Sequence, residues 1–305
     1  MKTKYLISIV GPTAIGKTAL SIKLAQHFKT EIISADSRQF FKEMEIGTAA
    51  PTKQELASAK HHFVHNKSIH DNYSVGIFEK EVLKTLNTLF KTNNIVIMVG
   101  GSGLYVDAVT KGLDDFPDID STIRENLNNE LKTKGLLHLQ EQLKTLDLKS
   151  YETIAIDNPH RIIRALEICI GTGKPYSSFL SKKLANRNFK TISVGLMADR
   201  EIIYNRINQR VDTMIKMGLL NEVENLYDFK KLNSLNTVGY KELFKYLDEK
   251  WELDFAIAEI KKNTRRFAKR QLTWFKKNKE TLWFDYKTEP NIIVKALEDR
   301  LKYSS

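Results

Sequence analysis

The 305-residue sequence contains a single cysteine, and this scarcity limits how the chain can be stabilised. One cysteine excludes an intrachain disulfide, which agrees with a protein of the reducing cytoplasm. That residue, Cys169, lies in a helical apolar pattern, so we interpret it as buried filler. Long hydrophobic runs are also absent, because no stretch approaches the ~18 apolar residues that a membrane helix needs. We therefore expect a cytoplasmic protein with no membrane partner.

Acidic residues are scarce relative to basic ones: 37 Asp and Glu stand against 48 Lys and Arg, which gives a formal net charge of +11. Such an excess favours a polyanionic partner. Residues 261–279 contain nine basic residues and no acidic one. An apolar stripe at helical spacing along this segment leaves most of the basic side chains facing outward. We interpret the segment as a helix that binds a nucleic-acid backbone, with an ordinary solvated face as the alternative.

The most specific motif is G-x-x-x-x-G-K-[ST], the phosphate-binding loop, at residues 11–18. The apolar run Tyr5–Val10 predicts a buried strand before it, and Thr18–Phe28 has helical spacing after it. In a strand, glycine loop and helix of this kind, backbone N–H groups converge on an anion. We expect Lys17 to reach the outer phosphate and Thr18 to hold Mg²⁺. The loop residues are Gly11, Pro12, Thr13, Ala14, Ile15, Gly16, Lys17 and Thr18.

Polar residues follow the ends of two further predicted strands. Asp36 follows Glu31–Ser34, and Ser102 lies in the glycine-rich turn after Ile95–Val99. Ligands of doubly wound sheets lie beyond the carboxyl ends of the strands, so we expect both residues beside the phosphate loop. Asp36 would act as a general base or as a water-mediated Mg²⁺ ligand, with a helix cap as the alternative. No Walker-B aspartate follows Ile95–Val99, which counts against an ordinary ATPase.

The organisation of the chain changes in the middle, where strand signals give way to helical patterns. We assign residues 114–190 to an α-helical insertion domain, whose third helix begins at Asn158-Pro159. Strand signals return at Lys190–Leu196. The sequence therefore predicts an α/β fold, a P-loop NTPase-like parallel sheet flanked by helices, built from residues 1–113 and 191–305.

Basic residues on two predicted helices are further candidates for phosphate contacts. His160, Arg161 and Arg164 share the first turns of one helix, where they either bind phosphates or form an exposed face. Arg206 and Arg210 have i, i+4 spacing on another. They would either neutralise a phosphate or pair with nearby acidic side chains.

Histidines and aspartates each gather once in the sequence, but neither group has the spacing of a metal site. The histidines at residues 61, 62, 65 and 70 lack cysteine partners and a helical i, i+4 arrangement. The aspartates between residues 114 and 120 surround Pro117, and we interpret them as a solvated linker with helix caps. We assign no metal site to either group.

Taken together, the motifs resemble the tRNA dimethylallyltransferase family, also called the tRNA isopentenyltransferases. The matching stretches are GPTAIGKTAL, ISADSRQFFKEMEIGTAAPT, HHFV, YSVGIF, GGSGLYVDAV, NPHRIIRALE, DREIIYNRINQRVDTMIKMGL, NTVGYKE and TRRFAKRQLTWF. They follow the order of the family over nearly the whole chain. One departure is Thr48-Ala-Ala-Pro51, which has alanine where lysine is common.

The resemblance implies transfer of a dimethylallyl group from dimethylallyl diphosphate to N6 of the adenosine just 3′ of the anticodon, in tRNAs that read codons beginning with U. The phosphate loop would then bind the diphosphate of the donor, with Mg²⁺ as cofactor. Asp36 matches the aspartate of the family's S-x-D-S motif and would take the N6 proton. Lys17 would stabilise the departing diphosphate. Ser102 matches a position that is usually threonine, and its hydroxyl would contact the target nucleotide or the leaving group.

The resemblance also implies a tRNA-binding surface and an insertion domain that closes over the anticodon stem-loop of a monomeric enzyme. The positions carried over as tRNA contacts are Asp36, Ser37, Arg38, Gln39, Ser102, Arg124, His160, Arg161, Ile162, Ile163 and Arg164.

The residues themselves leave two other enzyme classes open. A small-molecule or nucleotide kinase would use the same loop with ATP. An isopentenyltransferase that acts on free adenylates would not need the basic helix at residues 261–279.

Overall fold

The computed structural model describes residues 3–180 and 185–303, which form two compact units. The sheet unit comprises Met1–Lys111 and Arg187–Ser305, and the helical unit comprises Gly112–Asn186. The unit limits therefore differ by a few residues from the predicted 113/114 and 190/191. Part of the predicted insertion belongs to the sheet unit, because the Arg187 side chain donates to the carbonyls of Ala108 and Val109 and Phe189 is buried in the sheet core.

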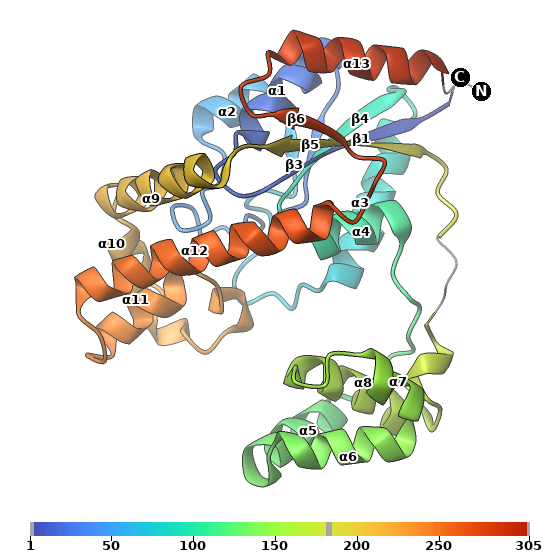
Figure 1. Cartoon of the computed structure of the whole chain (residues 1–305), viewed down its shortest axis with the longest axis vertical. Coiled ribbons are helices and arrows are strands. Elements are labelled where there is room, and N and C mark those ends of the chain that lie inside the picture. The colour runs from blue at the N-terminus through green and yellow to red at the C-terminus, as the bar shows by residue number, and fades with distance from the viewer. Residues whose placement is uncertain (1–2, 181–184, 304–305) are drawn as a thin grey trace. The chain divides into compact units, whose positions relative to one another are not determined.

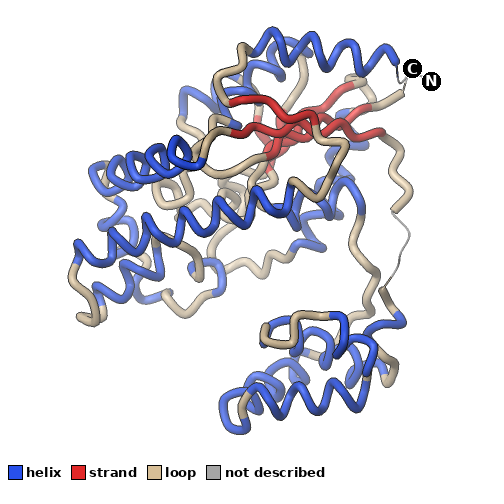
Figure 2. The backbone as a smooth tube through the Cα atoms, viewed as in Figure 1, coloured by secondary structure: helices blue, strands red, loops and turns tan. Residues whose placement is uncertain are grey.

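Within the described residues, six parallel strands form one sheet in the order β3-β2-β4-β1-β5-β6, drawn in red in Figure 2. The predicted α/β fold with a parallel sheet is confirmed. The register places Ile7 of β1 beside Ile97 of β4 and Ile192 of β5. The edge strand β6 was not predicted. The strands are β1 (Tyr5–Val10), β2 (Ile32–Ser34), β3 (His61–His62), β4 (Ile95–Val99), β5 (Lys190–Met197) and β6 (Leu282–Asp285).

Helices cover both faces of the sheet (Figure 1), and this explains why β4 is apolar without interruption and β1 is apolar except for the buried Ser8. Ile7 and Ile9 of β1 face one layer, with α1 and α13, whereas Leu6 and Val10 face the other, with α3 and α4. Both strand faces therefore exclude water. The layer helices are α1 (Lys17–Phe28), α13 (Pro290–Tyr303), α3 (Val75–Leu89) and α4 (Gly103–Lys111).

A further group of helices packs around Tyr240, which is fully buried. Its hydroxyl donates to Glu222, and the same carboxylate accepts the backbone N–H groups of residues 45–47. The Glu222 carboxylate therefore holds the loop at residues 45–47 in place. The elements are α9 (Arg200–Lys216), α10 (Leu219–Glu224), η2 (Tyr227–Phe229), η3 (Asn233–Leu235), α11 (Tyr240–Leu247) and α12 (Leu253–Phe275). The short α2 (Lys53–Ser58) does not belong to this group and contacts α1, where the Gln26 side chain donates to the Ser58 carbonyl.

The helical unit has its own apolar core, which includes Leu139, Leu143 and Leu166. Its α8 begins as predicted, with Asn158 accepting two backbone N–H groups and proline at the first turn. Asp120 caps α5. The helices are α5 (Ser121–Lys134), α6 (Leu136–Leu146), α7 (Leu148–Thr153), α8 (Pro159–Thr172) and η1 (Tyr176–Ser178). Across the described residues of both units, no helix has the length and apolar character needed to span a bilayer.

Candidate active site

A cavity of about 640 Å³ lies at the carboxyl ends of β1, β2 and β4. Its size is typical of a small-molecule site. The phosphate loop, the residues after β2, the turn after β4 and part of α9 contribute to its wall. Among the predicted site residues, the wall includes Thr13, Ala14, Ile15, Gly16, Lys17, Thr18, Asp36 and Gln39.

The phosphate loop contains backbone φ angles that few residue types adopt easily. Gly11 has φ +142°, and a Cβ there would lie 2.6 Å from the Leu196 carbonyl oxygen. Ala14 has φ 64°, in the left-handed region. Lys17 is the first residue of α1, and its Nζ donates to the Pro12 carbonyl at 2.7 Å. Burial lowers the pKa of Lys17 to about 7, although the Asp36 carboxylate opposes this shift.

Two arginines of α9 contact the loop. Arg206 Nε donates to the Ala14 carbonyl at 2.7 Å, and Arg210 Nη1 donates to the Thr13 hydroxyl at 3.4 Å. Arg210 lines the cavity, and burial lowers its pKa. Arg206 therefore holds the loop backbone, whereas Arg210 adds positive charge to the cavity itself.

Asp36 lies in the cavity wall, and it caps no helix of the described residues, because the next helix after it begins only at Lys53. Its Oδ1 accepts the Arg38 backbone N–H at 3.0 Å. Burial raises the pKa of Asp36, while that N–H and the Lys17 ammonium act in the opposite direction. A raised pKa makes the carboxylate a better proton acceptor. The backbone contact fixes its position.

The other predicted residues near Asp36 contact neighbouring parts of the chain. The Ser102 hydroxyl accepts the Ser37 backbone N–H and donates to the Ser37 hydroxyl, both at 3.0 Å. Arg38 Nη1 donates to the carbonyls of Asn233 and Ser234. Gln39 donates to the carbonyls of residues 48 and 49. Ser102 thus ties together the turns after β2 and β4, and Arg38 anchors a 3₁₀ turn.

In the helical unit, the predicted tRNA-contact residues fall into three classes: buried, exposed and ion-paired. The side chains of Ile162 and Ile163 are buried in its core, which removes them from a side-chain contact with RNA. His160 and Arg161 are exposed on the first turn of α8.

Arg124 and Arg164 both bind the buried Glu167, at 2.9 Å. Burial alone would raise the pKa of Glu167, but the two guanidinium groups hold it below its ordinary value.

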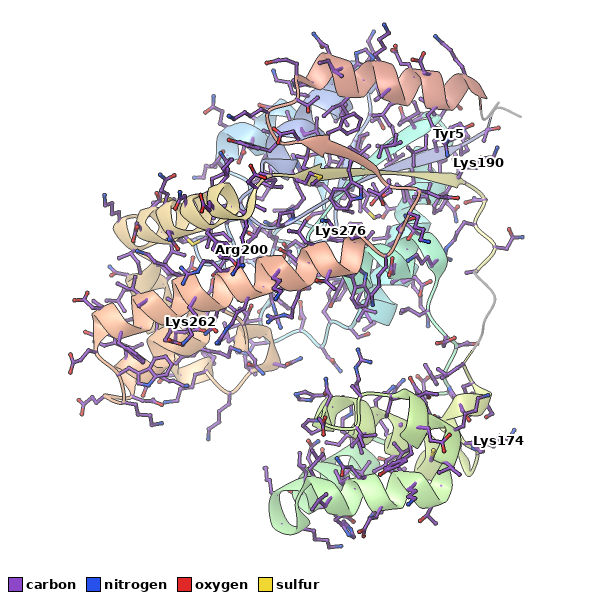
Figure 3. The ribbon with its side chains drawn as sticks, in the orientation of Figure 1. Tyr5, Lys174, Lys190, Arg200, Lys262 and Lys276 are labelled. Atoms are coloured by element: carbon purple, nitrogen blue, oxygen red, sulfur yellow. The ribbon has the colours of Figure 1, made fainter. Side chains whose placement is uncertain are left out.

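The basic segment at residues 261–279 lies on the last turns of α12 and just beyond them; Lys262 and Lys276 mark the two parts in Figure 3. Arg266, Lys269 and Arg270 are exposed, as predicted. Arg265 is an exception, because its Nη1 donates to Asn208 at 2.7 Å. We use "outward face" for the exposed residues Arg266, Lys269, Arg270, Lys276, Lys277 and Lys279.

Gln271 was missed by sequence reasoning. It lies on the buried side of α12, where its Oε1 accepts the Thr13 backbone N–H and its Nε2 donates to the Gly101 carbonyl, both at 2.8 Å. A neutral amide at a buried position of a strongly basic helix is the only local sign of this role.

Comparisons with known proteins match nearly the whole chain to one family of enzymes. The family model described as IPP transferase matches residues 39–278. A tRNA dimethylallyltransferase of Flavobacterium johnsoniae is 61% identical over 307 residues, covering 99% of each chain. One of Christiangramia forsetii is 60% identical, covering 98% of this chain and 99% of that protein.

Solved structures give the same result. The full-length tRNA isopentenylpyrophosphate transferase of Bacillus halodurans superposes with a TM-score of 0.71 at 36% identity, covering 99% of both chains. A eukaryotic dimethylallyltransferase, described as acting on tRNA, superposes with a TM-score of 0.78 at 26% identity, covering 94% of this chain and 75% of that one.

Proposed function

This chain belongs to the tRNA dimethylallyltransferase family, and we propose that it transfers a dimethylallyl group from dimethylallyl diphosphate to N6 of the adenosine just 3′ of a tRNA anticodon. The relatives support a prenyltransferase that modifies tRNA, and they do not support the kinase alternative. The donor, the target atom and the residue roles are the parts that we propose.

The observation that carries the proposal is the meeting of Lys17, Arg210 and Asp36 in one cavity. The two cationic side chains lie where a diphosphate would leave with growing negative charge. Asp36, whose pKa is raised by burial, is a proton acceptor in the same cavity. The cavity therefore combines leaving-group stabilisation with proton removal.

The reaction needs both functions at once. The lone pair of the exocyclic amine is delocalised into the adenine ring, which makes the amine a weak nucleophile. As N6 forms a bond to C1 of the donor, the bond between C1 and the diphosphate oxygen breaks. The proton lost from N6 passes to Asp36. The phosphate-loop amides, Lys17 and Arg210 take up the charge of the diphosphate.

The donor atoms of the cavity suit Mg²⁺ bound partly through the substrate. Thr18 and the carboxylates of Asp36 and Glu55 line it, and oxygen is the ligand atom that Mg²⁺ prefers. Among the described residues, no group of three or more His, Cys, Asp or Glu side chains has the arrangement of a metal cage. We propose that Thr18 holds Mg²⁺ together with substrate phosphates and water, where the ion would neutralise diphosphate charge.

For the tRNA, we propose two contact surfaces, one on each unit. The outward face of α12 supplies cations that contact the RNA backbone. In the helical unit, His160 and Arg161 supply a second exposed basic site. The target adenine has to leave the anticodon-loop stack before its amine can reach the Asp36 carboxylate in the cavity.

One experiment separates the candidate functions. The full chain is incubated with Mg²⁺, dimethylallyl diphosphate labelled in the prenyl group, and either bulk tRNA or AMP. We expect label in tRNA alone, at an adenosine next to the anticodon. Label in AMP would move the assignment to a free-nucleotide enzyme. A parallel incubation with ATP checks for ADP release, and stoichiometric release with a phosphorylated acceptor would refute the proposal.

A further inference from the structure

Gln271 occupies an unusual place for a polar side chain. It is 5% exposed, on the side of α12 that also buries Ala268 and Phe275. Its immediate neighbour Arg270 belongs to the outward face of the same helix. One turn of α12 therefore carries a solvent-exposed cation and a buried neutral amide.

The two hydrogen bonds of this amide fix its orientation. The carbonyl oxygen accepts from the Thr13 N–H, and the amide nitrogen donates to the Gly101 carbonyl. An amide turned the other way would place donor against donor and acceptor against acceptor. Gln271 therefore clamps the phosphate loop to the turn after β4.

The clamp removes one donor from the phosphate loop. Thr13 is the third residue of the motif, and in such loops the backbone N–H groups cradle the phosphates while the lysine reaches the outermost one. Because the Thr13 N–H is already bound, fewer loop amides remain for a ligand. Gln271 does not line the cavity itself. It lies next to Gly101, which does, because a Cβ built on Gly101 would lie 2.3 Å from Gln271 Nε2.

We propose that Gln271 limits this phosphate loop to ligands with two phosphates. Its amide binds the Thr13 N–H and so leaves the loop with one donor fewer for a ligand, which favours a diphosphate over a triphosphate chain. The inference rests on the proposed function, since it explains how a prenyl diphosphate is selected over a nucleoside triphosphate.

The test uses inorganic pyrophosphate and inorganic tripolyphosphate as probes, titrated calorimetrically into the full chain with Mg²⁺. We expect the wild type to prefer pyrophosphate. Gln271→Ala frees the Thr13 N–H, so the ratio of the two dissociation constants should shift by about tenfold or more toward tripolyphosphate. Loss of a merely structural contact would weaken both anions alike and leave the ratio unchanged, which would overturn the proposal.

Two further variants keep the test sharp. Gln271→Met retains most of the bulk without the hydrogen bonds, so it should lose the preference for pyrophosphate as Gln271→Ala does, and it covers the case in which Gln271→Ala folds poorly. A Met variant that folded and kept the preference would overturn the proposal. Asn263→Ala is the matched control, because it removes another α12 amide that binds Glu242, away from the loop, and should leave both constants unchanged.

Prenylation of tRNA by the wild type is measured separately with labelled donor. Prenylation without the expected shift in the ratio would refute the role of Gln271 alone. Absence of prenylation would instead refute the proposed function, while the anion preference would still be measured.

Discussion

The two sides of α12 show how one helix serves two different kinds of contact. The buried side contributes Gln271, whose neutral amide makes two specific backbone hydrogen bonds at the phosphate loop. The outward face carries cations that are exposed to water, including Arg266, Lys269 and Arg270. On the buried side, the loss of one hydrogen-bonding atom should lower stability, because a buried polar group without a partner carries a free-energy cost. Exposed cations act mainly through summed, salt-screened attraction.

This difference predicts how variants of the two regions should behave. Changes in the cavity should alter the chemical step or the binding of the donor. Changes on the outward face should alter tRNA affinity and its dependence on salt, while the rate at saturating tRNA stays constant.

The largest effect on the chemical step is expected for Asp36. Asp36→Asn removes the proton acceptor but keeps an oxygen that accepts the Arg38 N–H, so the fold should be preserved. Loss of a general base costs ~10²–10⁴ in rate, and the single-turnover rate with saturating tRNA and donor should fall by that amount. Donor affinity should change much less.

Asp36→Ala provides the matched comparison for a structural role. It removes both the proton acceptor and the contact with the Arg38 N–H, so it should lose stability by about 0.5–1.5 kcal/mol, as for a lost hydrogen bond, in addition to losing rate. Thermal unfolding measures this part. A near-normal single-turnover rate in Asp36→Asn, with a loss of stability only in Asp36→Ala, would leave Asp36 with a structural role alone.

Contacts between neighbouring residues were predictable from the sequence. The strand, loop and helix at the phosphate loop follow from a short motif with apolar segments on each side. In α3, Phe78, Val82, Leu86 and Leu89 recur at helical spacing, and they are the buried residues of that helix. The placement of Asp36 beside the loop follows from a general property of parallel sheets. These inferences need only periodicity and strand order.

Contacts between distant residues were not predictable in the same way. Gln271 lies 258 positions from Thr13, and nothing in helical periodicity pairs the two. Arg38 was expected at the tRNA, but its guanidinium binds carbonyls of a 3₁₀ turn 195 and 196 positions away. The strand β6 is four residues long, which is too short to show a clear alternating pattern in the sequence. Its place in the sheet depends on pairing with β5. Such partners are decided by tertiary packing.

The second prediction concerns pH, through Lys17. Burial places its pKa at about 7, so much of the side chain is neutral above that value. A bound diphosphate favours the ammonium and raises the pKa. The stabilisation of the complex is therefore complete below pH 7 and is lost as the pH rises, by up to about tenfold in donor affinity per pH unit.

Calorimetry at pH 8, in buffers of different ionisation enthalpy, should detect uptake of about one proton by Lys17 when the donor binds. Lys17→Arg is the control, because arginine stays protonated and the donor's own titration is common to both proteins. The difference between the two pH profiles isolates Lys17. Identical profiles from pH 6 to pH 9 would show that Lys17 is charged throughout.

The smallest effect on chemistry is expected for the outward face of α12. The triple variant Arg266→Gln, Lys269→Gln and Arg270→Gln should weaken tRNA binding without changing the single-turnover rate at saturating tRNA. Arg265 is left intact because it binds Asn208 within the fold. Each lost phosphate contact should reduce the slope of log affinity against log salt by ~0.7–0.9. Affinity is measured by titration with bulk tRNA at several salt concentrations.

A matched variant separates local contact from overall charge. Lys295→Gln, Arg300→Gln and Lys302→Gln remove the same charge from exposed positions of α13, which lies across the sheet from α12 in Figure 1. General attraction between a basic protein and RNA would weaken alike in both variants. Contact at the outward face predicts a much larger change in slope for the α12 variant, because counterions are released only where a cation meets a phosphate. Equal slopes in the two variants would place the tRNA elsewhere on the protein, and dimethylallyl diphosphate binding should stay unchanged in both.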